Sequence, residues 1–220
     1  PIEPYYFVDK LIECFNEEEV IVGGNGTAFL LPFQVGKVKN NQRYIWNSGD
    51  ASMGYDLPAA IGACFANDCK RTVCLAGDGS IMMNLQELQT VKHYNLPIKL
   101  FVLNNNGYIS IQQTQKNFFE GRMTACTENS GVSIPDFIKV GKAFGLETVK
   151  INSLTDLELQ IKKVLEKQGP VLCEVMLSPD YIFAPKLSAK KLPDGTMISP
   201  SLEDMYPFLD RKEYEENILR

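Results

Sequence analysis

The chain has 220 residues, with 22 basic and 27 acidic side chains and a formal net charge of −5. This length is sufficient for one large domain with a sizeable core, and the acidic balance, without a basic stripe, argues against a nucleic-acid partner. Apolar runs such as "LFVL" at residues 100–103 are far shorter than the roughly 20 residues that a membrane-spanning helix needs, so we expect no membrane segment. Small molecules or other protein chains are the expected partners.

Apolar runs rich in Val, Ile and Leu alternate along the chain with segments of helical periodicity. In chain order, the expected elements are a helix at 4–15, a strand at 20–23, a helix at 27–37, a strand at 43–46, a helix at 55–66, a strand at 72–77, a helix at 84–94, a strand at 98–105, a helix at 135–144, a strand at 147–151, a helix at 154–168 and a strand at 170–177. Ser153 is the expected N-cap of the last helix, and Gly145 and Gly169 are expected just beyond helix C-termini. The alternation predicts an α/β fold: a doubly wound, six-stranded, mainly parallel sheet with helices on both faces.

The two ends of the chain differ from this pattern. Residues after 177 form a proline-rich tail that ends in a short charged helix, so we predict a first domain at 1–177 and a C-terminal tail at 178–220. The chain begins at Pro1 without a signal peptide, and we expect it to be a domain of a longer protein. Its six cysteines form no CxxC pair or metal-ligand pattern, which is typical of reduced thiols in a cytoplasmic protein.

Polar, glycine-containing loops follow four of the predicted strands. They read "GGNGTA" (23–28), "NSGDASMGYDLP" (47–58), "GDGS" (77–80) and "NNNGY" (104–108). Because ligands of open parallel sheets bind beyond the carboxyl ends of the strands, these loops are expected to surround one site.

An acidic residue interrupts the loop that is best suited to a phosphate. Gly77 and Gly79 would let a ligand approach the backbone, and the N–H groups that open the next helix favour an anion. Asp78 would repel a bare phosphate, so we expect it to bind Mg²⁺, with the amide oxygen of Asn105 and the backbone carbonyl of Gly107 as further ligands. The sequence therefore predicts a magnesium-assisted phosphate site.

The spacing of these two motifs carries a family resemblance. "GDG", then 24 residues, then "NN" resembles the thiamine diphosphate motif of thiamine diphosphate-dependent enzymes. The text "GDGSIMMNLQELQTVKHYNLPIKLFVLNNNGY" resembles the acetolactate synthase group, which includes related carboligases and 2-keto acid decarboxylases. "SGDASMGYDLPAAIGA" (48–63) resembles that group's "SG…MGYGLPAAIGA" segment.

The resemblance implies a fold and roles for individual residues. Residues 1–177 would be the C-terminal diphosphate-binding domain of such an enzyme, and the tail would pack on or near the active site. Met53 would hold the thiamine in its bent shape, and the Ala51 carbonyl would accept a hydrogen bond from the aminopyrimidine. The remaining expected cofactor contacts are Asn25, Gly26, Thr27, Ser52, Gly77, Gly79, Ser80, Tyr108 and Ile109.

The resemblance also implies parts that this chain does not contain. The glutamate that activates thiamine lies on a separate pyrimidine-binding domain in this family, so we expect no catalytic residue here. A middle domain, which holds FAD in acetolactate synthases, would belong to the full-length protein, as would the domains that form a homodimer or tetramer. We expect the isolated chain to be inactive and to bind thiamine diphosphate weakly.

The expected substrate is a 2-keto acid, and the acceptor is open to question. Acetolactate synthases carry a tryptophan in a segment resembling "VRQWQ", whereas this chain reads "IQQTQ" (111–115), with Thr114 at that position of the substrate pocket. A smaller polar residue favours a bulkier acceptor such as a keto sugar.

Two alternatives belong to other classes. One is a non-catalytic assembly module with the same fold. The other is a nicotinamide-dependent oxidoreductase built on "GGNGTA", which is disfavoured because Phe29 occupies the third glycine position and no acid follows about 20 residues on.

Overall fold

The computed structural model describes residues 1–192 and 194–218. It consists of two compact units, Pro1–Tyr181 and Ile182–Arg220. The predicted division after residue 177 stays a prediction, and residues 193 and 219–220 of the predicted tail lie outside the described residues.

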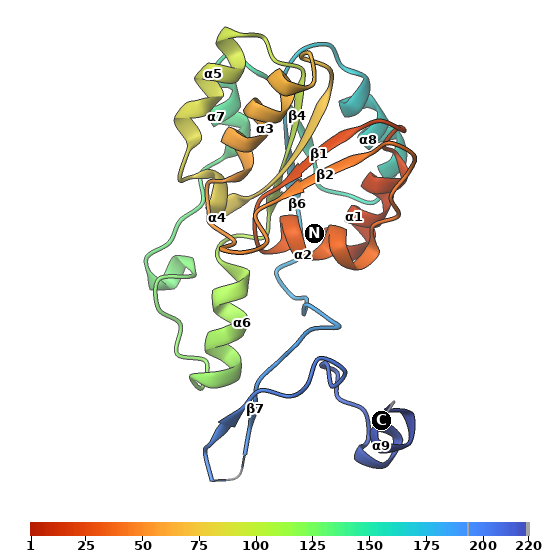
Figure 1. Cartoon of the computed structure of the whole chain (residues 1–220). Helices are drawn as coiled ribbons and strands as arrows, with labels where there is room; N and C mark the ends of the chain where they lie inside the picture. The colour runs from red at the N-terminus through yellow and green to blue at the C-terminus, as the bar shows by residue number, and fades with distance from the viewer. Residues whose placement is uncertain (193, 219–220) are drawn as a thin grey trace. The chain divides into compact units, whose positions relative to one another are not determined.

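The first unit contains a six-stranded parallel sheet in the order β2-β1-β3-β4-β6-β5 (Figure 1). Its strands are β1 (Val20–Gly23), β2 (Arg43–Trp46), β3 (Thr72–Gly77), β4 (Ile98–Asn104), β5 (Glu147–Ile151) and β6 (Val171–Met176). The helices between them are α1 (Pro4–Glu13), α2 (Thr27–Val35), α3 (Asp56–Ala66), α4 (Asp78–Ile81), α5 (Leu88–His93), α6 (Ile109–Phe118), α7 (Phe137–Ala143) and α8 (Leu157–Glu166), with 3₁₀ turns at Leu85–Glu87 and Glu128–Ser130. This architecture confirms the predicted α/β fold.

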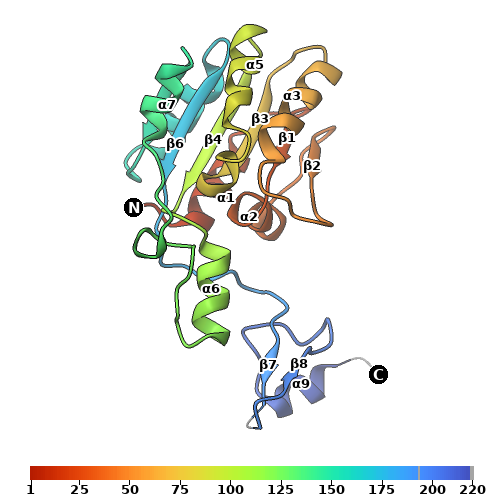
Figure 2. The same ribbon diagram turned by 90° about the vertical axis from the view of Figure 1, so that its left-hand side faces the viewer.

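Helices cover both faces of the sheet, as Figure 2 shows. Helices α1, α2 and α8 lie on one face, where Phe7 of α1 packs near Phe101 of β4 with ring centroids 6.3 Å apart. Helices α3, α5 and α7 lie on the other, where Leu57 and Phe137 belong to one buried apolar cluster with residues of the central strands. Burial on both faces explains why β3 and β4 read as continuous apolar runs.

Two predicted helix starts are wrong, and one helix was not predicted. Helix α8 begins at Leu157 after Asp156, whose φ of 50° is left-handed, so Ser153 is not its N-cap. The helix expected at 84–94 starts later, because the Asn84 side chain donates to the Gly54 carbonyl at 2.6 Å and a 3₁₀ turn precedes α5. Helix α6 was not expected at all.

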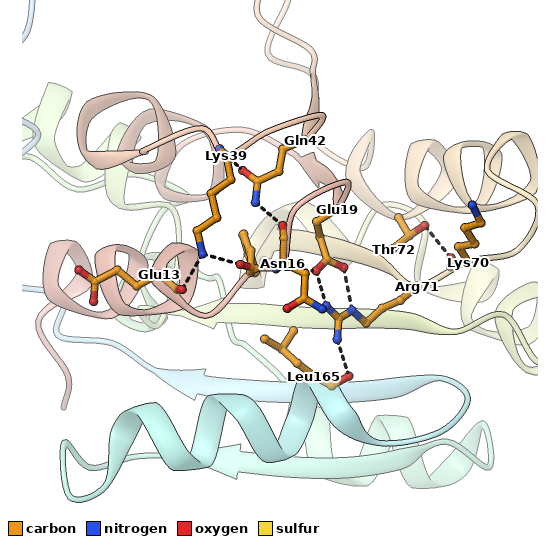
Figure 3. Close-up of polar contacts among 10 residues, drawn as sticks. Glu13, Asn16, Glu19, Lys39, Gln42, Lys70, Arg71, Thr72 and Leu165 are labelled. Atoms are coloured by element: carbon orange, nitrogen blue, oxygen red, sulfur yellow. Dashed lines mark hydrogen bonds and ion pairs between the residues drawn. The ribbon is translucent and has the colours of Figure 1, made fainter.

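The amino-terminal edge of the sheet is held by a polar network (Figure 3). Arg71, directly before β3, donates through Nε to Glu19 Oε1 at 2.7 Å and through Nη1 to the Leu165 carbonyl of α8 at 3.2 Å. Glu19, directly before β1, is only 5% exposed. Lys39 donates to the Glu13 carbonyl at 2.8 Å. These contacts join helix ends to strand starts at the edge opposite the predicted site.

The second unit contains the two-residue strands β7 (Lys190–Lys191) and β8 (Met197–Ile198), which pair antiparallel, and helix α9 (Arg211–Asn217). Asp204 binds both Lys190, at 2.5 Å, and Arg211, at 2.8 Å. The short charged helix expected at the end of the chain is therefore confirmed. Among the described residues, no helix has both the length and the apolar character needed to cross a membrane.

Candidate functional site

A cavity of about 270 Å³ opens at the carboxyl ends of three adjacent strands, β1, β3 and β4. The loops that follow these strands line it, together with part of the loop after β2. The lining residues are Asn25, Gly26, Thr27, Met53, Gly77, Asp78, Gly79, Ser80, Asn105, Gly107, Tyr108, Ile109, Ser110 and Ile111. The parallel sheet thus brings together residues that are up to 86 positions apart in the sequence, from Asn25 to Ile111.

Asp78 is a buried carboxylate whose hydrogen-bond donors, among the residues that the structure describes, are backbone N–H groups. Its Oδ2 accepts from Asn105 at 3.1 Å and from Gly107 at 3.0 Å, and its Oδ1 accepts from Gly79 at 2.7 Å. Burial raises the pKa of Asp78 to about 6, although these N–H groups oppose the shift. None of the described residues forms an ion pair with this carboxylate. A buried carboxyl group in such surroundings favours either a proton or a cation.

Asn105 presents an oxygen atom that lacks a hydrogen-bond donor. Its Oδ1 is buried and, within the described part of the chain, has no hydrogen-bond partner. Its Nδ2 donates to Thr27 Oγ1 at 3.3 Å and to the Tyr181 hydroxyl at 3.2 Å. Buried polar atoms are nearly always satisfied, so this oxygen is available to accept a bond from a ligand that enters the cavity.

The preceding residue fixes the loop from the other side. Asn104 donates through Nδ2 to Glu174 Oε1 at 2.9 Å, and its Oδ1 accepts from the Asn106 N–H at 3.0 Å. Glu174 in turn pairs with Lys150, Nζ to Oε2, at 3.0 Å. The two asparagines therefore have different roles: Asn104 stabilises the loop, and Asn105 lines the cavity.

A side chain at either of two glycines of the site would force neighbouring atoms to move. Gly107 has a φ of +130°, and a Cβ there would lie 2.7 Å from the Cys126 carbonyl oxygen. A Cβ at Gly79 would lie 2.1 Å from Cε1 of Tyr108, whose ring packs on that backbone. Close approach of backbone and ring thus requires glycine at both positions.

A second buried carboxylate, Asp56, lies beneath the "GDGS" loop. Its Oδ2 accepts from the Ser80 hydroxyl at 2.6 Å, and that hydroxyl accepts from the Gly54 N–H at 3.0 Å. Asp56 is fully buried, and burial raises its pKa to about 6. Since the single hydroxyl hydrogen of Ser80 is used by Asp56, the main chain of Ser80 is what remains for the predicted diphosphate.

Three predicted residues lie outside the cavity lining. The Ala51 carbonyl accepts from Asn25 Nδ2 at 3.1 Å, and Ser52 is exposed beside it. Thr114 is exposed on α6, where its hydroxyl donates to the Ser110 carbonyl at 3.1 Å. Their expected roles stay predictions.

The sequence did not single out Tyr181 or Asp56. Tyr181 follows β6 by several residues, and nothing in its local sequence indicates a return to the site. The sequence does contain an indication for Asp56. This residue occupies the position of the second glycine in the "MGYGLP" segment that "MGYDLP" resembles.

The cavity combines a buried carboxylate with glycine-rich loops at the carboxyl ends of parallel strands, and the comparisons with known proteins identify the family. Residues 24–175 match the family described as "Thiamine pyrophosphate enzyme, C-terminal TPP binding domain". This match covers more than half of the chain, which therefore belongs to that family.

The relatives are acetolactate synthases. The chain is 33% identical over 180 residues to acetolactate synthase 2, chloroplastic, of Zea mays, and the alignment covers 80% of this chain and 28% of that protein. It is 28% identical over 180 residues to the acetolactate synthase isozyme 1 large subunit of Escherichia coli (strain K12), with coverages of 82% and 32%. It is 34% identical over 155 residues to the acetolactate synthase large subunit of Porphyra purpurea, with coverages of 70% and 26%. The chain thus spans about a quarter to a third of the length of these relatives.

Proposed function

We propose that this chain binds the diphosphate of thiamine diphosphate through a Mg²⁺ ion held by Asp78, Asn105 and Gly107. The observation that carries the proposal is the pair formed by the buried Asp78 carboxylate and the unpartnered Asn105 Oδ1. Both are hard oxygen ligands of the type that Mg²⁺ prefers, and Mg²⁺ commonly links such groups to substrate phosphates. The Gly107 carbonyl, on the same loop, is the third proposed ligand.

The other residues of the cavity would hold and shape the cofactor. Gly79 and Ser80 on one side, and Asn25, Gly26 and Thr27 on the other, are the proposed diphosphate contacts. Met53 lines the same cavity and is 40% exposed, which suits an apolar support for the thiamine rings. Thiamine diphosphate, once bound, supplies the carbanion chemistry, while these residues orient it.

Calorimetry on the 220-residue chain tests the proposal. Titration of thiamine diphosphate into the chain in the presence of Mg²⁺ should give binding heat. This heat should disappear when EDTA replaces the metal. Asp78→Ala should abolish the Mg²⁺-dependent binding, whereas Asp50→Ala, which removes an exposed carboxylate from the loop after β2, should retain it. Binding by Asp78→Ala that equals the parent chain, or tighter binding of NADH than of thiamine diphosphate, would contradict the proposal.

We further propose that the longer protein is a 2-keto acid carboligase or decarboxylase of the acetolactate synthase type. This proposal rests on the names of the relatives. The activating glutamate, FAD, oligomeric assembly and cytoplasmic localisation remain predictions. Thr114, where acetolactate synthases carry tryptophan, favours an acceptor bulkier than pyruvate, such as a keto sugar. Efficient acetolactate formation by the full-length protein with pyruvate alone would refute the sugar acceptor.

A further inference from the structure

Tyr181 reaches the proposed cation site from the segment that follows β6. Its hydroxyl is hydrogen-bonded to Thr27 Oγ1 and lies 3.2 Å from Asn105 Nδ2. Its backbone carbonyl accepts from Gln113 Nε2 of α6 at 2.9 Å. Tyr181 therefore joins α2, α6 and the end of β4, three elements that surround the cavity.

The contacts of Asn105 decide which of its side-chain atoms faces the cation. A rotation of its amide by 180° exchanges the positions of the oxygen and the NH₂ group. In the structure, the Thr27 and Tyr181 hydroxyls bind Nδ2, and Oδ1 is the atom without a partner. An NH₂ group in that place would repel a cation.

We propose that Tyr181 is a positioning residue, whose hydroxyl, together with that of Thr27, holds the Asn105 amide so that Oδ1 is the atom offered to the divalent cation. This inference rests on the proposed Mg²⁺ and thiamine diphosphate site and adds to it a residue outside the motifs. The cation is recognised through a neutral oxygen whose orientation is set by two hydroxyl groups.

The hydroxyl acts by hydrogen bonding and not as an acid or a base. Burial raises the pKa of Tyr181 to about 12, so the phenol keeps its proton under physiological conditions. Loss of this hydroxyl would leave Nδ2 with only the 3.3 Å contact to Thr27, and the amide would gain rotational freedom. A typical hydrogen bond contributes about 1 kcal/mol, which corresponds to about a five-fold change in affinity.

The test measures the Mg²⁺ concentration that gives half-maximal thiamine diphosphate binding to the 220-residue chain by calorimetry. Tyr181→Phe should raise this concentration about five-fold. Tyr44→Phe is the matched control, because the Tyr44 hydroxyl is buried on β2 without a hydrogen-bond partner among the described residues. The unfolding midpoint of each variant, followed by the fluorescence of the single tryptophan, Trp46, shows how much of any weaker binding results from lost stability.

The outcomes separate this inference from the proposed function. If the parent chain shows Mg²⁺-dependent binding, Asp78→Ala abolishes it and Tyr181→Phe binds like the parent, the positioning role is refuted while the proposed function stands. If Tyr181→Phe weakens binding only in proportion to a lowered unfolding midpoint, the role is refuted as well. If the parent chain shows no Mg²⁺-dependent binding, both are refuted.

Discussion

Replacing Asp56 by asparagine should change how the stability of the chain depends on pH. Asp56 is fully buried and makes its hydrogen bonds to the Ser80 hydroxyl and the Leu57 N–H, with no cation among them. Its pKa is raised from 3.8 to about 6, chiefly by burial. Asparagine has nearly the same shape and does not ionise, so the variant isolates the effect of the buried charge.

The sign and size of the effect follow from proton linkage. An acid with a raised pKa in the folded state binds more protons there than in the unfolded state, so it favours folding most at pH values below 3.8. This contribution is lost as the pH rises through about 6. At roughly 1.4 kcal/mol per pKa unit, the free energy of unfolding should fall by about 3 kcal/mol over this range because of Asp56.

Urea unfolding followed by Trp46 fluorescence measures this dependence on the sheet-containing unit. The difference in unfolding free energy between Asp56→Asn and the parent chain should rise by about 2.4 kcal/mol in favour of the variant from pH 4 to 7, and then stay constant. Asp50→Asn, which removes the same charge from an exposed side chain, should add no change of that size. Parallel pH profiles for Asp56→Asn and the parent, within about 0.5 kcal/mol, would refute the assignment of a buried, raised-pKa carboxyl.

Two further changes test the opposite edges of the sheet. Gly107→Ala places a Cβ 2.7 Å from the Cys126 carbonyl oxygen at a φ of +130°, so it should destabilise the chain by about 1–3 kcal/mol and weaken thiamine diphosphate binding. Gly49→Ala is the control, because a Cβ there would meet no atom of the described residues within 4 Å, its chain neighbours aside. Equal stability and binding of the two variants would contradict the prediction. Arg71→Met leaves the buried Glu19 carboxylate without its ion-pair partner and should cost about 3–5 kcal/mol in urea unfolding. Lys162→Met, which removes an exposed i,i+4 partner of Glu158, should cost less than about 0.5 kcal/mol, and a similar loss for both variants would argue against a buried pair.

The sheet and the loops at its carboxyl edge could be predicted because each feature is local in the sequence. Strands β3 and β4 are continuous apolar runs, and each is followed at once by the polar glycine loop that lines the cavity. Once parallel pairing is assumed, the geometry of the sheet brings "GDGS" and "NNNG" together. The candidate cation ligands therefore followed from pattern and spacing.

Helix α6 escaped prediction because its buried face is polar. Its buried residues are Ile109, Gln112 and Gln113, and the two glutamines bind the carbonyls of Cys126 and Tyr181. A search for hydrophobic periodicity does not detect a helix whose buried face is polar.

The contact of Tyr181 with Asn105 could not be predicted either, because it joins residues 76 positions apart. The contact depends on the path of the chain after β6, which carries no local motif. The proposed orientation of the Asn105 amide depends in turn on that contact, so it follows from tertiary structure and not from the local sequence.

We propose above that a divalent cation joins this chain to a diphosphate. A crystal structure of the chain with thiamine diphosphate and Mn²⁺, recorded at the manganese absorption edge, tests it most directly. We predict one anomalous peak in the cavity, coordinated by an Asp78 carboxylate oxygen, Asn105 Oδ1, the Gly107 carbonyl and the diphosphate. A cofactor bound there without a metal, or a metal bound without Asp78 and Asn105, would contradict the claim.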